Sequence, residues 1–388
     1  MVSPNLPAET DVFVVGGGPA GLGAALAARR NGLEVVVADR ARPPINKACA
    51  EGLMPDAIAA LHRIGVEINS DHGMPFRGIR FIEKQVEAEA SYPRLHGFGV
   101  PRSTLHQLMV DRVNDAGITT LWHTRIDAIA PSGVVVGGRT VRCRWIIGAD
   151  GFHSRVRKWA GLRPRWTGAR RIGFRRHFHV RPWTDFVEVY WHAHGQAYVT
   201  PVAPNTVCVA IVSSDSRVDM TSLPVFFPKL AARLEDAQAI GPERGAISMT
   251  TRLDAVTRGR IALIGDASGS VDAITGEGLA LAFRQADLLG AALAAEDLAA
   301  YATAHRRIGR IPRLMARCLL LMDGNERLRG RALSALAAHP RIFDRLLAAH
   351  IGELKPTEVA YDVIALALRI LAPGASSPTP ASAVVRRQ

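Results

Sequence analysis

The stretch Gly16-Gly17-Gly18-Pro19-Ala20-Gly21 decides the fold of this chain. It follows a short apolar run, 12–15, and opens a run of small residues, 22–29, that suits a helix. In a strand–turn–helix unit, the first glycine permits the turn and the second lets the backbone approach a pyrophosphate. The third glycine lets the helix pack against the sheet, and the helix N-terminus then faces the phosphates. The sequence therefore predicts a dinucleotide-binding turn.

A second apolar run, 35–38, ends in an acid, Asp39, which is followed by Arg40. Asp39 lies 18 residues after Gly21, close to the spacing at which an acid meets a ribose hydroxyl in dinucleotide-binding proteins. We therefore expect Asp39 and Arg40 to lie beside the dinucleotide. The alternative interpretation is a glycine-rich turn that binds nothing.

Two later segments have the same form, a buried strand that ends in a tight turn. Residues 145–151 end in Asp-Gly, and residues 260–266 end in Gly-Asp. A Gly-Glu-Gly turn, 276–278, and an Ala/Leu-rich stretch follow the second segment. In this order, and together with the turn 16–21, they resemble the FAD-binding pattern of one flavoprotein family. That family includes class A aromatic hydroxylases, geranylgeranyl reductases and flavin-dependent halogenases.

The resemblance covers most of residues 8–320, and it is more specific for the fold and for FAD than for the reaction. It implies an α/β fold, with a Rossmann-like FAD-binding domain, an inserted antiparallel β-sheet substrate domain and a helical C-terminal region. The residues that it assigns to the cofactor are Gly16, Gly18, Pro19, Ala20, Gly21, Asp39, Arg40, Cys49, Arg102, Ile126, Asp150, Gly151, Arg157, Gly265, Asp266, Gly276, Gly278 and Leu279.

The resemblance also implies roles for some of these residues. Asp266 would bond the ribityl hydroxyls, and Arg102 would lie near the pyrophosphate or the ribityl chain. Asp150 and Arg157 would serve both FAD and a reduced nicotinamide cofactor. The alternatives are structural, with Arg102 as a surface residue at a helix start and the Asp150–Arg157 pair holding its turn. Backbone N–H groups of the turn 275–278 would stabilise the negative charge that reduction places on flavin N1 and the C2 carbonyl.

The segment 47–53 resembles the Cys-Gly-Gly-Gly-Leu-type loop of geranylgeranyl reductases, with Ala50 and Glu51 in place of two glycines. Cys49 would line the flavin or be a small buried residue, and both interpretations stay open. No partner for a redox pair with Cys49 lies nearby in the sequence. Halogenases of this family also have a lysine near the flavin and a Trp-x-Trp-x-Ile-Pro segment, and the sequence shows neither feature.

Length and composition limit the class of protein. A chain of 388 residues can hold two domains with sizeable cores. No uncharged apolar stretch reaches about 18 residues, so no membrane-spanning helix is expected. The four cysteines have no metal-binding spacing, and we expect no metal and reduced thiols in a cytoplasmic protein. The net charge of +13 comes mostly from dispersed arginines, so nucleic-acid binding is not expected.

The FAD-binding domain is expected to be discontinuous, because β-branched and aromatic runs between 170 and 213 indicate an inserted meander. A helix is predicted at 222–240. The predicted units are an FAD-binding domain of residues 8–79, 99–165 and 255–296, a substrate domain of 80–98 and 166–254, a C-terminal helical region of 297–372, and a disordered tail of 373–388.

Histidines and tyrosines of the meander are the candidates for proton transfer to or from a substrate. They are His177, Tyr190, His192 and Tyr198. Alternation places Tyr190 and His192 on the same face of their strand, but it does not tell which face lines the pocket. Each of the four could instead be a structural residue of the sheet.

Two reactions fit this pattern. The first is hydroxylation of an apolar, electron-rich phenolic or polyketide-like molecule by an FAD-dependent monooxygenase that uses O2 and NADPH or NADH. The second is reduction of a lipophilic alkene, as in geranylgeranyl reductases, and a flavin-binding protein without turnover is the third possibility. The sequence has no second G-x-G-x-x-G unit, so the nicotinamide cofactor is expected to visit transiently. We expect a monomer or dimer. Its leucine- and arginine-rich C-terminal helices would either pack simply against the FAD-binding domain or cap an apolar pocket, and in the second case they could contact membranes peripherally.

Overall fold

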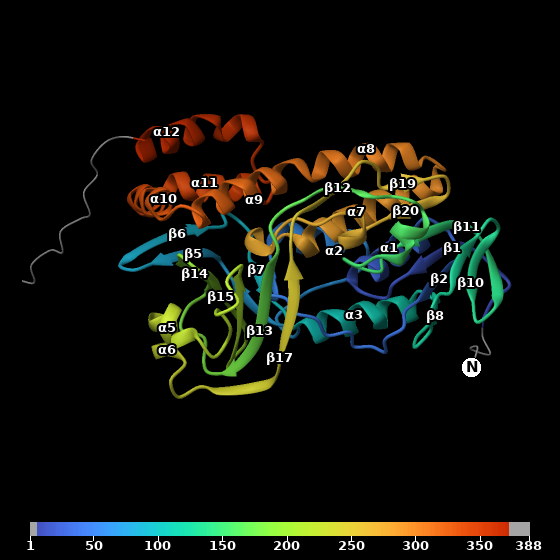
Figure 1. Cartoon of the computed structure of the whole chain (residues 1–388), viewed down its shortest axis with the longest axis horizontal. Coiled ribbons are helices and arrows are strands. Elements are labelled where there is room, and N and C mark those ends of the chain that lie inside the picture. The colour runs from blue at the N-terminus through green and yellow to red at the C-terminus, as the bar shows by residue number, and fades with distance from the viewer. Residues whose placement is uncertain (1–5, 372–388) are drawn as a thin grey trace, which may run out of the picture.

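The glycine turn at 16–21 follows the central strand of an eight-stranded sheet (Figure 1). The computed structural model describes residues 6–371. Residues 12–15 and 35–38 are all buried, as expected of strands inside a parallel sheet that is covered on both faces. The parallel strands, in spatial order, are β20 (Ile261–Leu263), β11 (Arg139–Gly148), β1 (Glu9–Val15), β2 (Val35–Ala38) and β8 (Thr119–Leu121). The antiparallel strands β9 (Ala128–Ala130), β10 (Gly133–Val136) and β19 (Thr257–Arg258) complete the sheet.

Small residues let two helices of this lobe pack closely. Helix α1 (Pro19–Arg30) lies against α7 (Gly278–Ala294), and a Cβ atom at Gly290 would lie 2.7 Å from the backbone of Ala27. The apolar residues of both helices join one buried cluster with the strands β1 and β2. The other helices of the lobe are α2 (Pro55–Arg63), α3 (Arg102–Asp115), α4 (Arg155–Trp159) and α8 (Leu298–Ile308).

A seven-stranded sheet forms the other lobe of the molecule (Figure 1). All its neighbouring strands are antiparallel except the β5–β14 pair, which is parallel. In spatial order the strands are β17 (Gln238–Ser248), β13 (Arg171–His179), β16 (Thr206–Ser213), β15 (Gly195–Ala203), β14 (Phe186–His192), β5 (Gly78–Glu83) and β6 (Val86–Ser91). The α/β fold class predicted from the sequence is confirmed, including the inserted sheet and the helical C-terminal region.

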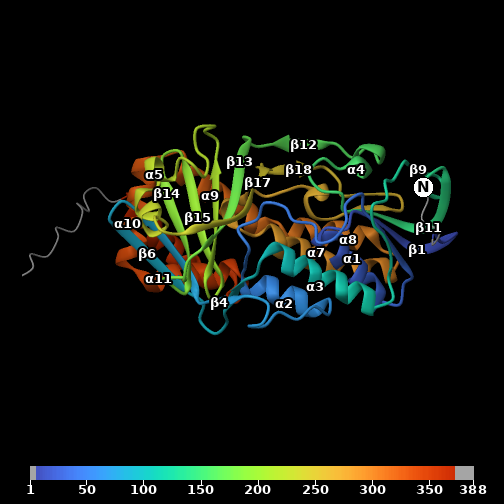
Figure 2. The ribbon, with the colours of Figure 1, turned by 90° about the horizontal axis from the view of Figure 1, so that it is seen from below.

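The two faces of the seven-stranded sheet are covered by different helices. The short helices α5 (Leu223–Phe226) and α6 (Pro228–Arg233) cover one face, and their apolar side chains join its buried cluster. The helices α9 (Arg310–Asp323), α10 (Glu326–Ala338) and α11 (Pro340–His350) cover the other face. Helix α12 (Ala360–Leu371) is the outermost layer, beyond α10 and α11 (Figure 1). Figure 2 shows α10 and α11 behind the strands of this sheet. The face under α9–α11 is the one that meets the nucleotide-binding lobe, through Ala50, Val271 and Ile274.

Short elements connect the two lobes. They are β3 (Gly52–Leu53), β4 (Met74–Phe76), β7 (Gly97–Gly99), β12 (Pro164–Thr167), β18 (Thr251–Leu253) and the 3-10 turns η1 (Gly265–Ser268) and η2 (Ala273–Thr275). A third 3-10 turn, η3 (Pro356–Val359), joins α11 to α12. The helix predicted at 222–240 is confirmed only in part. Two short helices, α5 and α6, occupy residues 223–233, and the prediction is wrong beyond them, because the chain enters the edge strand β17 at Gln238. The predicted tail, 373–388, lies outside the described residues. Of the described helices, none has both the length and the apolar character needed to cross a bilayer.

Candidate cofactor and active site

The glycine turn has the geometry that a dinucleotide site needs. Gly16 has a φ of 115°, and a Cβ atom there would lie 2.4 Å from the carbonyl oxygen of Ala149. A Cβ at Gly21 would lie 1.8 Å from the Gly16 carbonyl oxygen. At Gly18, by contrast, a Cβ would meet no atom of the described residues within 4 Å. Gly16 and Gly21 are thus required by packing, whereas Gly18 opens onto free space at the N-terminus of α1, where Pro19 is the first helical residue.

The acid after β2 holds the turn in place. One Asp39 oxygen accepts the Gly17 N–H at 2.7 Å, and the other accepts the Ala41 N–H at 2.7 Å. Arg40 is exposed. Ala20 lies close to the second flavin-type motif, because a Cβ at Gly265 would be 2.7 Å from the Ala20 Cβ. The turn 16–21 and the turn at 265 therefore lie side by side, although they are far apart in the sequence.

The Asp-Gly motif after β11 has a structural role in part. One Asp150 oxygen accepts the N–H groups of Arg155 (2.6 Å) and Val156 (3.1 Å) at the start of α4, and the other is buried without a partner among the described residues. The Arg157 guanidinium donates to the carbonyl oxygens of Ala267 (3.2 Å) and Phe152 (2.7 Å). Arg157 thereby ties the turn at Gly151, whose φ is 78°, to the turn at 265–267, so it holds both in place and faces no open space.

Asp266 is the exposed carboxylate at the centre of the site. Its side chain is open to solvent, yet the surrounding protein desolvates it enough to raise its pKa, while Lys47, Arg102 and Arg157 act in the opposite direction. The Arg102 Nε is buried and, within residues 6–371, has no hydrogen-bond partner. An open carboxylate beside an unpaired guanidinium N–H matches the hydroxyls and phosphates of FAD, so these residues fit the cofactor.

The second open surface lies at the N-terminus of α7. Gly276 has a φ of 68°, and Cβ atoms at Gly276 and Gly278 would meet nothing within 4 Å in the described part of the chain. The side chain of Leu279 turns inward, against the core of α1 and α7. Asp272 caps the preceding turn η2 by accepting the Ile274 N–H at 3.0 Å. Free space in front of a helix N-terminus is suited to the charge of a reduced flavin.

A buried polar group supports this turn from the seven-stranded sheet, and the sequence analysis missed it. Arg171 on β13 donates to Asp272 at 2.9 Å and to Gln196, and its Nη2 lies 3.6 Å from Asp323 on α9. Tyr198 on β15, a predicted site residue, donates its hydroxyl to the Ile274 carbonyl oxygen at 3.2 Å. Burial raises the pKa of the Tyr198 phenol, so it stays protonated and positions the turn. The Arg171 partners are dispersed along the chain, and no motif links them.

Three other predicted residues lie away from the open surfaces. Ile126 is buried in the core beneath the eight-stranded sheet, and only its carbonyl oxygen is engaged, by Arg155 at 3.1 Å. Tyr190 and His192 lie on the face of β14 that α5 and α6 cover. Tyr190 donates to Glu188 at 2.7 Å, and the His192 ring packs on Phe226. Because residues of one parity share a face of a strand, both are turned away from the nucleotide-binding lobe and are not catalytic candidates.

Glu51 and His177 form the main titratable pair of the site. The Glu51 backbone has a φ of 63°, a conformation that glycine adopts easily, and its carboxylate is fully buried. His177 Nε2 lies 2.6 Å from one Glu51 oxygen, and the other oxygen accepts the Arg102 N–H at 2.9 Å. Arg175 Nη2 lies 3.4 Å from the same oxygen that Arg102 bonds. Glu51 thus connects the loop 47–53 and Arg102 to the seven-stranded sheet.

Two thiols lie beside this pair. The Cys49 Sγ accepts the Glu51 N–H at 3.3 Å, and the Cys208 thiol donates to the Cys49 carbonyl oxygen at 3.7 Å. Burial raises the pKa of both thiols. Donor atoms of Glu51, His177 and Cys208 lie within 4.8 Å of one another, a spacing that a metal ion would accept. The Arg175 guanidinium, 3.2 Å from His177 Nδ1, already supplies a positive charge there, so the geometry favours an ion pair over a metal site.

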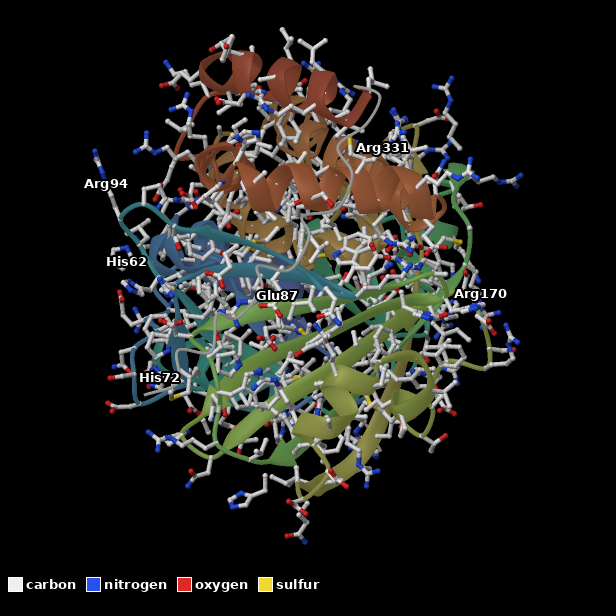
Figure 3. All side chains as sticks on the ribbon, turned by 90° about the vertical axis from the view of Figure 1, so that its left-hand side faces the viewer. His62, His72, Glu87, Arg94, Arg170 and Arg331 are labelled. Atoms are coloured by element: carbon white, nitrogen blue, oxygen red, sulfur yellow. The ribbon has the colours of Figure 1, made fainter. Side chains whose placement is uncertain are left out.

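A surface hollow of about 960 Å³ lies away from these residues. It is at the C-terminal ends of α1, α2 and α3, where Arg30, His62 and Arg112 are among its lining residues. His62 and His72, which also lines it, appear at the same edge of the molecule in Figure 3. None of the predicted site residues lines this hollow.

Comparisons with known proteins agree with this geometry. Residues 9–300 match the family model described as "FAD binding domain". The chain is 28% identical to menaquinone reductase of Mycolicibacterium smegmatis over 70% of this chain and 73% of that protein. It is 34% identical to 6-methylpretetramide 4-monooxygenase of Streptomyces rimosus over 40% of this chain and 41% of that protein. A flavoprotein/dehydrogenase from Cytophaga hutchinsonii has a similar structure, with a TM-score of 0.80 at 16% identity over 92% of this chain and 95% of that chain.

Proposed function

Because this chain belongs to the FAD-binding-domain family and is an FAD-dependent oxidoreductase, we propose that it hydroxylates an apolar, electron-rich substrate such as a phenol, using O2 and NADPH or NADH. When bound, FAD supplies the two-electron chemistry of either a hydroxylase or a reductase. The open space at Gly18 and the N-terminus of α1 would hold its pyrophosphate, and Asp266 with Arg102 its ribityl chain. The N–H groups of the turn 276–278 would stabilise negative charge on the flavin.

The observation that carries the proposal is the Glu51–His177 pair. A phenol attacks an electrophilic oxygen faster when its own proton has left, and a positioned imidazole is suited to remove that proton. His177 Nε2 is held at 2.6 Å by a fully buried carboxylate, which stabilises the imidazolium that forms. To act as the base, His177 would take the phenol proton at Nδ1, where the substrate hydroxyl would displace the Arg175 guanidinium that lies 3.2 Å away. The geranylgeranyl-reductase-type loop has glycine where this chain has Glu51. A role in acid–base chemistry would explain why this chain has a carboxylate at that position.

Apolar surface near this pair supports a lipophilic substrate. The sheet face that α9 and α10 cover carries Val189, Trp191, Ala210 and Val212, which are buried in one cluster with Ala316 and Leu333. A substrate that enters between the sheet and these helices would contact alkyl and aromatic groups, which favours an alkyl-chain or polycyclic phenol over a small acid.

The outer surface of α12 supports peripheral contact with a membrane, where such substrates dissolve. Tyr361, Ile364, Leu368 and Leu371 follow a helical spacing and are 81%, 59%, 64% and 73% exposed. Residues 297–371 contain 12 Lys and Arg against 7 Asp and Glu, a net charge of +5. Arg331, labelled in Figure 3, lies near α12 and donates to its Ile370 carbonyl oxygen at 3.4 Å. An apolar stripe within a basic surface is the pattern of helices that lie on anionic lipid.

The second candidate is reduction of a lipophilic alkene. The match to menaquinone reductase over 70% of the chain and the loop 47–53 both favour it. In that reaction the same pair would deliver a proton to the reduced carbon, and the flavin would supply the hydride. The requirement for O2 separates the two candidates.

The test incubates the FAD-loaded protein with NADPH or NADH and a long-chain alkylphenol, and a matching alkene in parallel, while O2 uptake is recorded. Hydroxylation is expected to add one oxygen atom to the phenol and to consume O2 in proportion to product. A gain of two hydrogens by the alkene, without O2 uptake, would instead support the reductase.

A further inference from the structure

A group of buried polar side chains lies directly behind the flavin-binding turn. Glu277 stands between Gly276 and Gly278, and it is the N-cap residue of α7. Its side chain is only 1% exposed, so it points into the protein while the two glycines face open space. It lies near His350 at the end of α11, and the charges of Asp56, at the start of α2, and Arg284 on α7 act on it. Asp56 in turn lies near Arg284 and acts on Tyr92, after β6. We call these five residues the acid site.

The acid site contains an unusual number of unsatisfied polar atoms. Both Asp56 oxygens, one Glu277 oxygen, the Tyr92 hydroxyl and His350 Nδ1 are buried and lack a hydrogen-bond partner among residues 6–371. The contacts between these side chains are also long, with 3.8 Å between His350 Nε2 and Glu277 and 3.9 Å between Arg284 and Asp56. Polar groups at such distances are commonly bridged by ordered water, and buried polar atoms in native proteins are nearly always satisfied. The geometry therefore indicates water between these groups.

The charges of the acid site do not balance if both acids ionise. Asp56 and Glu277 face one cation, Arg284, whose side chain is 30% exposed. Burial raises the pKa of Asp56 to about 6 and moves the pKa of Glu277 well above its usual value, with Asp56 as a further cause. Arg284 and the more distant Arg63 oppose the shift at Asp56. Burial and Arg284 lower the pKa of His350 to about 4, so His350 is neutral, and burial keeps the Tyr92 phenol protonated by raising its pKa.

We propose that Asp56 and Glu277 hold one proton between them while the flavin is oxidised, and take up a second proton from solvent when the bound flavin is reduced. The inference rests on the FAD site proposed above. Two electrons and one proton reach the flavin itself, and the second proton binds the acid site, so the added negative charge is neutralised on both sides of the turn. An ionised carboxylate behind the turn would otherwise oppose the charge that the N–H groups of Gly276 and Gly278 stabilise.

The test measures the midpoint potential of the FAD-loaded protein between pH 7 and 8, with the absorbance spectrum reporting whether the reduced flavin is neutral or anionic. Each proton taken up in a two-electron reduction contributes about 30 mV per pH unit. The wild-type slope is expected to be about 60 mV per pH unit with an anionic reduced flavin. Asp56→Asn should halve the slope, whereas Glu87→Gln, an exposed acid on β6, should leave it unchanged.

Several results would overturn the inference. They are a wild-type slope of about 30 mV per pH unit, a reduced flavin that is itself neutral, and an unchanged slope in Asp56→Asn. A second measurement needs no flavin. It tests the inference even if Asp56→Asn fails to fold or if the protein binds no FAD. The infrared spectrum of the flavin-free protein at pH 7 should show a protonated carboxyl band that Glu277→Gln removes and Glu87→Gln retains. Absence of that band in the wild type would contradict the proton that Asp56 and Glu277 are proposed to share. If the band is present but the protein binds no FAD, only the proposed function is contradicted.

Discussion

The role that we propose for the Glu51–His177 pair can be tested with the substitution Glu51→Gln. Glutamine keeps the size of the side chain, and its one oxygen can still accept the Arg102 N–H, but the negative charge is lost and an NH2 group faces His177. A hydrogen bond to a charged partner contributes about 1.5–3 kcal/mol. Since about 1.36 kcal/mol corresponds to a factor of ten, turnover of a phenolic substrate should fall roughly 10- to 150-fold. The loss arises because the imidazolium of His177 no longer has a carboxylate 2.6 Å away.

The assay is product formation with an alkylphenol at saturating reductant, with FAD content measured on the same samples. Glu83→Gln is the matched control, because Glu83 also pairs in a buried position, with Arg329 at 2.7 Å, but on the α10 side of the sheet. Both variants should lose a similar amount of unfolding free energy, and only Glu51→Gln should lose turnover. If turnover in Glu51→Gln stays within threefold of the wild type while FAD content is normal, the pair is structural and the assignment of His177 as base is refuted.

The purified protein should be yellow and release FAD on heating, and release of FMN or retention of flavin by the denatured chain would contradict the cofactor assignment. Asp266→Ala should lower FAD content more than Asp150→Ala, and equal FAD contents would reject the distinction. The main effect of Asp150→Ala should be a loss of about 0.5–2 kcal/mol, seen as a lower Tm, because the first turn of α4 loses two hydrogen bonds while its N-cap Ser154 remains. The double substitution Ile364→Ser and Leu368→Ser should weaken sedimentation with anionic vesicles at least tenfold, and unchanged sedimentation would remove α12 from the membrane contact. Burial lowers the pKa of His305 to about 4, below its unfolded value of about 6.5. The contribution of His305 to stability is therefore present above about pH 6.5 and is lost as the pH falls towards 4. His305→Gln should flatten the decline of the unfolding free energy between these pH values, and an unchanged slope would contradict this prediction.

The sequence by itself determined the features that depend on neighbours along the chain. The turn 16–21 is readable because its glycines, the apolar strand before it and the small residues after it lie within about twenty positions. The same holds for the turns at Gly265 and Gly276, whose positive φ values only glycine adopts without strain. Alternation likewise predicted that Tyr190 and His192 share one face of β14.

Only the tertiary structure decided which groups meet across the chain. The helices α5 and α6 cover the face that carries Tyr190 and His192, and no local pattern could tell that face from the other. Glu51 lies 126 residues before His177, and the two meet because the loop 47–53 packs against β13. Glu277 is predictable as a member of a helix-start motif, but its contacts with α2 and α11 are long-range. Local sequence fixes backbone geometry, whereas the pairing of buried charges depends on packing between elements that the sequence does not order in space.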